Sequence, residues 1–351
     1  MSQLFAERFR AARKMKGLSL QDLADKLNNK ITKQGLHKYE KGDVLPDSNM
    51  IGLLSEVFDV RPEYFFRDVK VELGVIEFRK LVHFSAKEKN KIIEKTRETV
   101  SRYLELEDII GIKKEFVNPL SQITINSNED VEAAADELRN AWGLGVDPIY
   151  NVIELLEDNN IKVIEIEELD GFDGMQTMVN DNIPVIALNS AQLIQNDRKR
   201  FTALHELGHL LLKFAPHFTK KEKELFCHYF AGALLLPKVT AFKELGGART
   251  KLYINEFGVL KQQYGISIQA LAYRLNNLGI ITNSYTEHFI FMIRQSGWKI
   301  DEPFKYEGRE ISNRFTQLLF RALAEDMISM SKAASLSNQK LADFRQQSLV
   351  I

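Results

Sequence analysis

One helical stretch constrains this chain more than any other: it begins at Arg200 and reads R-F-T-A-L-H-E-L-G-H-L-L-L. Its apolar residues recur at the three- and four-residue spacing of a helix with a buried face, namely Phe201, Leu204, Leu207, Leu211 and Leu212. The polar exceptions are His205, Glu206 and His209. Because residues four apart lie one above the other on a helix, both imidazoles can reach the same point. Burying such polar groups in an apolar helix costs free energy unless hydrogen bonds or a bound metal ion compensate for the loss of water.

These polar residues form the H-E-x-x-H pattern of zinc peptidases. In that pattern two neutral imidazole nitrogens bind Zn²⁺, and the glutamate beside the first histidine takes the proton of the attacking water. The sequence therefore predicts a zinc site with His205 and His209 as ligands and Glu206 as the catalytic residue. The alternative is a pair of histidines whose hydrogen bonds are satisfied within the core.

Composition and charge restrict the class of protein. The chain has 351 residues, of which 44% are hydrophobic and 27% charged, enough for two or three domains with a substantial core. The formal net charge of -1 excludes a uniformly basic protein that coats nucleic acid. The sequence contains neither an apolar run of about 18 residues nor a signal-peptide core, and its single cysteine, Cys227, cannot form an internal disulfide. We therefore expect a cytoplasmic protein that does not bind membranes.

The first 67 residues predict five short helices in a compact stretch. Ser19 can cap a helix from Leu20 to Leu27, and Thr32 can cap the next, from Lys33 to Lys41. The short connection between them is typical of a helix-turn-helix, whose second helix of the pair enters the major groove. Five lysines and one acid lie between Lys26 and Lys41, and this local excess suits DNA phosphates.

The same stretch resembles the Cro-type (XRE) phage-repressor helix-turn-helix family. The pattern that carries the resemblance is Ser19-Leu20-x-x-Leu23-Ala24, then Ile31-Thr32-x-x-x-Leu36-x-x-Tyr39-Glu40-x-Gly42. It implies double-stranded operator DNA as a partner and a homodimer, because such domains read paired half-sites. It places toward DNA the residues Thr32, Lys33, Gln34, His37 and Lys38. Gln34 is the predicted base reader and the two lysines the predicted phosphate contacts. A helical dimerisation module with a lysine-rich solvated face is the alternative.

The remaining elements predict a small sheet among helices. Ser85 caps a long charged helix that can connect domains or support a dimer. Strands are predicted over 161–166, 175–179 and 183–188, the last two as a pair, and a further strand over 289–293. Pro148 is the predicted start of a helix that runs through Leu156, and a turn is predicted over 171–173. If the 183–188 strand lies at the sheet edge, a substrate peptide can add to it as another strand.

A catalytic zinc site needs three protein ligands and one open position, so a third donor must follow the histidine helix. A helix is predicted over 220–236 and is closed by Pro237. The candidate donors in or near it are His217, Glu222, Glu224, Cys227 and His228. Glu224 and His228 are four apart and share a face to which Cys227 lies close, so the residues alone leave the choice open.

A second resemblance assigns the third ligand. The run Asp197-Arg-x-Arg-Phe201-Thr-x-x-His205-Glu206-Leu-Gly208-His209-x-Leu-Leu, followed by Glu224-x-x-x-x-x-Phe230-Ala231-x-x-Leu234-Leu235-x-Pro237, is similar to the ImmA/IrrE family of zincin-like metallopeptidases. In that family a glutamate six residues before the Phe-Ala pair is the third ligand, which implies Glu224. The segment 260–281 resembles the small helix-turn-helix-like unit that follows the site in this family.

The chain departs from this family at one point, where Cys227-His228 replaces the usual Ala-Asn. Three roles for His228 stay open, namely binding the oxyanion, supporting the ligands, or binding the metal itself. A fourth possibility is that His228 has no role in the chemistry. We expect Cys227 to be a small packing residue.

Together these patterns predict an α+β fold. An all-α helix-turn-helix domain occupies 1–70, a charged linking helix 71–117, a zincin-like peptidase domain 118–285, and a helical C-terminal region without an assigned role 286–351. The predicted function is a DNA-binding transcriptional regulator that cleaves a partner protein, which the resemblance implies is a helix-turn-helix repressor. The alternative is a transcription factor or antitoxin whose zincin-like domain only senses a ligand or supports the structure.

Overall fold

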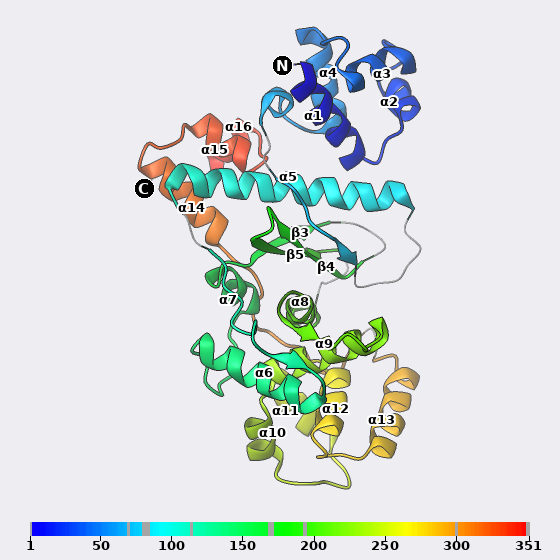
Figure 1. Ribbon diagram of the computed structural model, residues 1–351, viewed down its shortest axis with the longest axis vertical. Coiled ribbons are helices and arrows are strands. Elements are labelled where there is room, and N and C mark those ends of the chain that lie inside the picture. Colours follow the sequence, from blue (N-terminus) through cyan, green and yellow to red (C-terminus); the bar gives the residue numbers. More distant parts are fainter. Residues whose placement is uncertain are drawn as a thin grey trace. The chain divides into compact units, whose positions relative to one another are not determined.

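The computed structural model describes residues 2–68, 71–78, 85–112, 115–167, 172–191, 195–298 and 301–348 (Figure 1). The chain divides into two compact units, and neither is continuous in sequence. The first unit comprises Met1–Leu73, Val82–Lys113 and Arg314–Ile351, and the second Gly74–Leu81 and Lys114–Asn313. The C-terminal region expected over 286–351 is therefore shared between both units, whereas the four domain ranges themselves stay a prediction.

The first unit begins with the expected helix-turn-helix segment. Its elements are α1 (Ser2–Met15), α2 (Leu20–Lys26), α3 (Lys33–Lys41), α4 (Ser48–Phe58) and the 3-10 helix η1 (Pro62–Phe66). The predicted caps are confirmed: the Ser19 hydroxyl accepts a hydrogen bond from the Asp22 amide, and the Thr32 hydroxyl accepts one from the Gly35 amide. Gly42, with φ of 78°, ends α3 in the left-handed conformation that glycine adopts without strain. Aromatic side chains dominate the core, with Phe5, Phe9, Phe58 and Phe65 buried.

The first unit is completed by α5 and the last three helices. The capping box that Ser85 forms with Glu88 starts α5 (Ala86–Ile110), as the sequence predicts. The other three are α14 (Arg314–Ala324), α15 (Met330–Leu336) and α16 (Leu341–Gln347). Leu106 of α5 shares a hydrophobic cluster with Leu319, Leu336 and Phe344. The predicted linking helix is therefore also a packing surface for the C-terminal helices.

The second unit contains a four-stranded mixed sheet. Its order is β1 (Glu77–Phe78), β4 (Gly174–Val179), β5 (Ile183–Asn189) and β3 (Lys162–Ile166). β4 is antiparallel to both β1 and β5, and β5 is parallel to β3. The predicted hairpin is confirmed, and Asn180 and Asp181 make its turn with φ of 50° and 60°, as a type I′ turn requires. The predicted turn over 171–173 begins at Gly171, which lies outside the described residues.

The condition that the 183–188 strand lies at the sheet edge is not met. β5 lies between β4 and β3, so both of its sides are paired. The strand order could not be predicted from the sequence, because β1 comes from a segment about a hundred residues before β4. Glu77 of β1 pairs with Gln176 of β4. Any peptide that adds to this sheet as a strand must do so at another strand.

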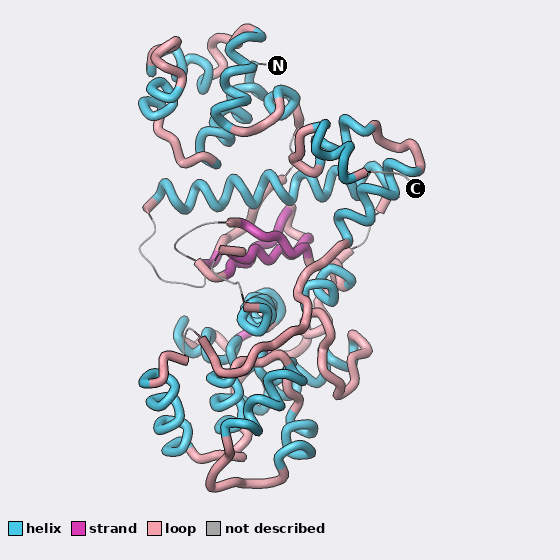
Figure 2. The backbone as a smooth tube through the Cα atoms, turned by 180° about the vertical axis from the view of Figure 1, so that it is seen from behind, coloured by secondary structure: helices cyan, strands magenta, loops and turns pink. Residues whose placement is uncertain are grey.

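The second unit also contains helices, and Figure 2 shows most strand residues as one small magenta group. The helices are α6 (Asn128–Ala141), α7 (Val152–Asp158), α8 (Asn196–Leu211), α9 (Lys220–Leu235), α10 (Lys238–Leu245), α11 (Ile254–Tyr264), α12 (Ile268–Asn277) and α13 (Asn283–Gln295). A short parallel pair, β2 (Thr124–Ile125) with β6 (Lys213–Phe214), accompanies them. Within the described ranges, no individual helix is long and apolar enough to cross a membrane; only α9 and α10, counted together across a sharp bend, pass by length and composition.

Two element predictions are wrong. The helix expected to start at Pro148 begins at Val152, because Asn151 caps it by accepting a hydrogen bond from the Glu154 amide. The strand expected over 289–293 lies inside α13, where Phe289, Ile290 and Ile293 are buried at helical spacing. A short apolar run fits a strand and a buried helix equally well, and here the Thr282 cap upstream selects the helix.

Candidate metal centre

α8 carries the H-E-x-x-H residues and is the central helix of the second unit. It packs on β4 and β5 on one side and on α9 on the other (Figure 1). Its buried residues therefore occur nearly all around the helix, and they include His205 and Glu206. His209, one turn later, is partly buried. His205 and Glu206 are thus shielded from bulk water, whereas His209 is partly accessible to it.

Three side chains converge on one point beside α8. The Nε2 atoms of His205 and His209 are 3.2 Å apart, and Glu224 of α9 places Oε2 3.2 Å from His205 Nε2 and Oε1 3.5 Å from His209 Nε2. Ligand atoms bound to one tetrahedral zinc at about 2.0–2.1 Å lie roughly 3.3–3.4 Å from each other. The three donors therefore have the spacing and the chemistry to hold a divalent ion.

The Glu224 side chain is in the ionised form that a metal ligand needs. Partial burial opposes its ionisation, but hydrogen bonds from His205 and His209 outweigh burial and hold the pKa of Glu224 well below its ordinary value. The carboxylate is therefore ionised throughout the neutral pH range, as metal binding requires.

The close approach of α8 and α9 explains how Glu224 reaches the histidines. A Cβ atom at Gly208 would lie 3.2 Å from the Cβ atom and 3.3 Å from the Cα atom of Cys227. The glycine thus lets the two helices touch one turn away from both His205 and Glu224. This confirms the packing role expected for Cys227, which is fully buried.

A second glycine lies against the predicted catalytic residue. A Cβ atom at Gly174, the first residue of β4, would be 2.9 Å from Thr202 Cγ2 and 3.1 Å from Glu206 Cγ. β4 therefore passes directly beside Glu206. Gly174 was not predicted from the sequence, although a glycine at a strand position is a signal of close backbone approach.

The structure distinguishes Glu224 from the other candidates for the third ligand. Among the described residues, the group able to share one ion contains Glu224 and neither His217 nor His228. Glu222 accepts hydrogen bonds from the amide and hydroxyl of Thr219 and forms the capping box of α9. His217 lies against Phe218, with ring centroids 4.1 Å apart. His228 is exposed, and its ring centroid is 4.2 Å from that of His205, so it borders the site without joining the ligand group.

Two buried cations fix the position of α8, and both use acids from the segment 301–313. Arg200 and Glu310 are fully buried, with the Arg200 Nε atom 3.4 Å from the carboxylate. Lys261 donates to Asp197 at 2.7 Å and to Glu302 at 2.6 Å. Burial opposes the charge of Lys261, but the hydrogen bonds to these two carboxylates outweigh burial and raise its pKa. Sequence analysis missed both acids because nothing in the chain links them locally to α8.

The predicted DNA contacts share one solvent face of the helix-turn-helix segment. The five residues are exposed, namely Thr32, Lys33, Gln34, His37 and Lys38. The opposite face of α3 buries Leu36 and Glu40. Glu40 holds α3 on α1 by an ion pair with Arg13 at 2.5 Å, so the exposed face is rigidly presented.

The fold and the two sites define a protein that joins a helix-turn-helix segment to a peptidase-like unit with a potential metal centre. Comparison with family models agrees: residues 9–65 match the model described as a helix-turn-helix, and residues 157–276 match the Peptidase_M78 model described as an IrrE N-terminal-like domain. The chain thus carries an XRE-type helix-turn-helix domain and an IrrE-type peptidase domain, and both recognitions from the sequence are confirmed. None of the curated proteins or solved structures compared with the chain matches it.

The contact of Gly208 with Cys227 predicts a specific loss of stability. Gly208→Leu should lower the free energy of unfolding by about 1–3 kcal/mol, because a side chain at this position forces α8 and α9 apart. Urea unfolding of the full-length chain measures the change. The matched control is Gly247→Leu, since a Cβ atom at Gly247 meets no atom within 4 Å. Equal stability of the two variants would contradict the role assigned to Gly208.

Proposed function

We propose that this protein is a DNA-binding transcriptional regulator with a zinc-dependent peptidase domain, and that it cleaves a partner repressor of the helix-turn-helix class. The observation that carries the proposal is the convergence of His205, His209 and Glu224 beside Glu206. A purely structural zinc site does not need a buried glutamate next to its first histidine. A cytoplasmic location and a homodimer belong to the same proposal and stay predictions.

The residues of the site have distinct tasks in this proposal. His205, His209 and Glu224 would hold zinc, which when bound polarises water and a substrate carbonyl for hydrolysis. Glu206 accepts the proton of the attacking water and donates it to the leaving nitrogen. The buried position of Glu206 against Gly174 fixes its carboxylate and limits its contact with solvent. His228, at the exposed border of the site, would bind the oxyanion or support the ligands.

β4 is the strand along which we propose that the substrate approaches. It passes beside Glu206 at Gly174, and within the described residues β1 pairs with it at Met175 and Gln176. An extended peptide that forms strand hydrogen bonds with β4 would thus be guided toward Glu206. The chain's own segment 74–78 lies along this strand, where the Gly74 amide donates to the Met178 carbonyl at 2.8 Å. Substrate binding would therefore displace that segment.

The role of Glu206 is tested by Glu206→Gln. The variant should retain about one zinc per chain, because its side chain is not a ligand, and should lose cleavage by at least about a hundredfold. Zinc is measured by elemental analysis, and cleavage by mass spectrometry of helix-turn-helix proteins encoded next to this gene. The matched control is Glu222→Gln, which alters a capping glutamate on α9. Wild-type cleavage by Glu206→Gln would refute the assignment.

The substrate route predicts that a cross-link over β4 blocks cleavage. Glu77 and Gln176 are directly opposite in the register, so Glu77→Cys combined with Gln176→Cys can form a disulfide that retains the segment on β4. We expect oxidation to lower the cleavage rate at least about tenfold and a thiol reductant to restore it. Glu77→Cys alone is the control. If the oxidised double variant cleaves at the rate of the reduced one, the substrate does not use this strand.

The DNA contacts predict two different defects. Gln34→Ala should relax the preference for one base of the operator, whereas Lys38→Ala should weaken binding to all sequences and reduce the salt dependence by about one ion. Gel shifts over a range of salt concentrations measure both effects. Lys220→Ala, which removes an exposed lysine of α9, is the control. The same loss in Lys38→Ala and Lys220→Ala would contradict a DNA contact at Lys38.

A further inference from the structure

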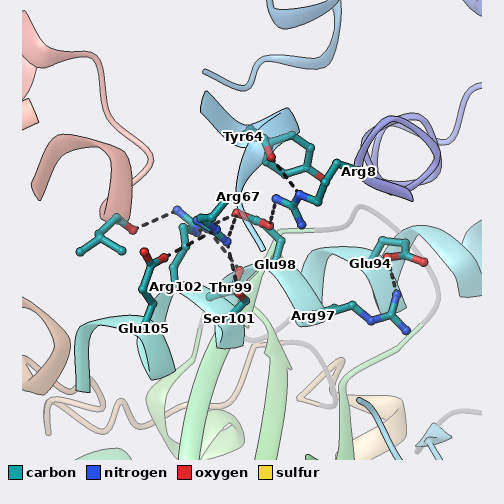
Figure 3. Close-up of polar contacts among 11 residues, drawn as sticks. Arg8, Tyr64, Arg67, Glu94, Arg97, Glu98, Thr99, Ser101, Arg102 and Glu105 are labelled. Atoms are coloured by element: carbon teal, nitrogen blue, oxygen red, sulfur yellow. Dashed lines mark hydrogen bonds and ion pairs between the residues drawn. The ribbon is translucent and has the colours of Figure 1, made fainter. Parts of the chain in front are cut away.

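A buried cluster of charges in the first unit contains more cations than carboxylates (Figure 3). Glu98 of α5 accepts ion pairs from Arg8 at 2.7 Å, Arg67 at 2.8 Å and Arg102 at 3.5 Å. Glu105 is shared by Arg67, at 3.6 Å, and Lys332 of α15. These ion pairs thus join four cations to two carboxylates, which leaves an excess of two positive charges among these six residues.

The three arginines of this cluster are largely shielded from water, whereas Lys332 is 35% exposed. The side chains of Arg8, Arg67 and Arg102 are only 6%, 13% and 14% exposed. Burial lowers the pKa of Arg102, and the charges of Arg67 and Arg8 lower it further, although Glu98 opposes them. Buried like charges without full compensation destabilise a fold. The cluster therefore has the electrostatics of a site that an anion would complete.

A cavity of about 510 Å³ lies beside the cluster and includes Arg67, Glu98 and Lys332 in its wall. This volume is within the range of about 300–1,000 Å³ that is typical of small-molecule sites. The wall adds a further cation and small polar residues, chiefly Arg61, Ser329, Ser331, Ser335 and Asn338. Its acids are Glu63 and Glu98.

Arg61 adds to the positive character of this cavity. Its guanidinium donates to the backbone carbonyls of Ser331 at 3.3 Å and Gln339 at 2.8 Å. Within the described part of the chain, no carboxylate forms an ion pair with Arg61. Arginine forks and serine hydroxyls are the groups with which proteins bind phosphate.

We propose that this cavity binds a small molecule that carries a phosphate group, with Arg61, Arg67 and Lys332 as the cationic contacts. A phosphate monoester carries a charge of about −1.5 to −2 at neutral pH, which matches the excess of the cluster. The serine hydroxyls of α15 supply further donors. Because the wall is formed by η1, α5 and α15, the bound anion joins the end of the helix-turn-helix segment to the C-terminal helices. Its binding would thereby influence how the first unit binds DNA.

The test uses the zinc-loaded chain of 351 residues and inorganic phosphate as the probe. Added phosphate should raise the unfolding temperature saturably by several degrees over chloride at equal ionic strength, because it binds only the folded state. Arg61→Ala should lose most of this shift. The matched control is Arg321→Ala, which removes an arginine that is 57% exposed on α14 and lies outside the cavity wall. Phosphate bound at the metal centre would stabilise Arg61→Ala as much as wild type, and that result would overturn the proposal.

A second variant keeps every arginine of the cluster. Ser331→Glu places a carboxylate on an exposed residue of the cavity wall, so it should fold and should abolish the phosphate shift by repulsion and by occupying the site. In wild type, saturating phosphate should also change the operator affinity in gel shifts at constant ionic strength, and this response should be absent in Ser331→Glu. An undiminished thermal shift in Ser331→Glu, or no shift in wild type, would refute the proposal. Neither readout depends on peptidase activity.

Discussion

The contact between α8 and α9 is the constraint on which the candidate metal centre depends. His205 and His209 share one helix, so their spacing is set by helical geometry alone. Glu224 comes from another helix, and its position depends on how closely the two helices approach. Gly208 against Cys227 sets that approach, because any side chain at Gly208 would meet the α9 backbone. The third candidate ligand is therefore positioned by packing, whereas the first two are positioned by sequence spacing.

α8 is itself held from several directions. The sheet covers one side through β4 and β5, and the buried pairs of Arg200 with Glu310 and of Lys261 with Asp197 fix its first turns. Glu310 also accepts hydrogen bonds from the amides of Val152 and Ile153, so one carboxylate serves both α7 and α8. Burial raises the pKa of Glu310, but Arg200 and these amides oppose that rise and favour its charged form. A peptidase unit that ended at residue 285 would lack Glu302 and Glu310 and would leave two buried cations without these partners.

The sequence predicted the parts of this fold that local rules determine. Three helices begin at a side chain that accepts a hydrogen bond from the amide three residues later, namely at Ser19, Thr32 and Ser85. The H-E-x-x-H spacing likewise brings two imidazoles together on any helix. Local rules did not reveal that β1 pairs with β4 or that β5 is interior, because strand order depends on partners distant in the chain. The apolar run at 289–293 was ambiguous for a different reason, because a short buried apolar run fits a strand and a helix equally well. Glu224 was predicted as the third metal ligand from the family resemblance, because residue spacing alone left several candidates.

The order of segments along the chain has a consequence for the stability of the helix-turn-helix segment. The first unit is assembled from three separate parts of the chain, and the second unit lies between them in sequence. The chain therefore passes from one unit to the other at four places, near residues 73, 81, 113 and 313. α5 needs α14 and α15 to cover Leu106 and its neighbours, and these helices are contributed by the end of the chain. Because unfolding of the C-terminal helices exposes the apolar side of α5, the helix-turn-helix segment and the C-terminal region should lose structure together, although about 200 residues of the peptidase unit separate them in sequence.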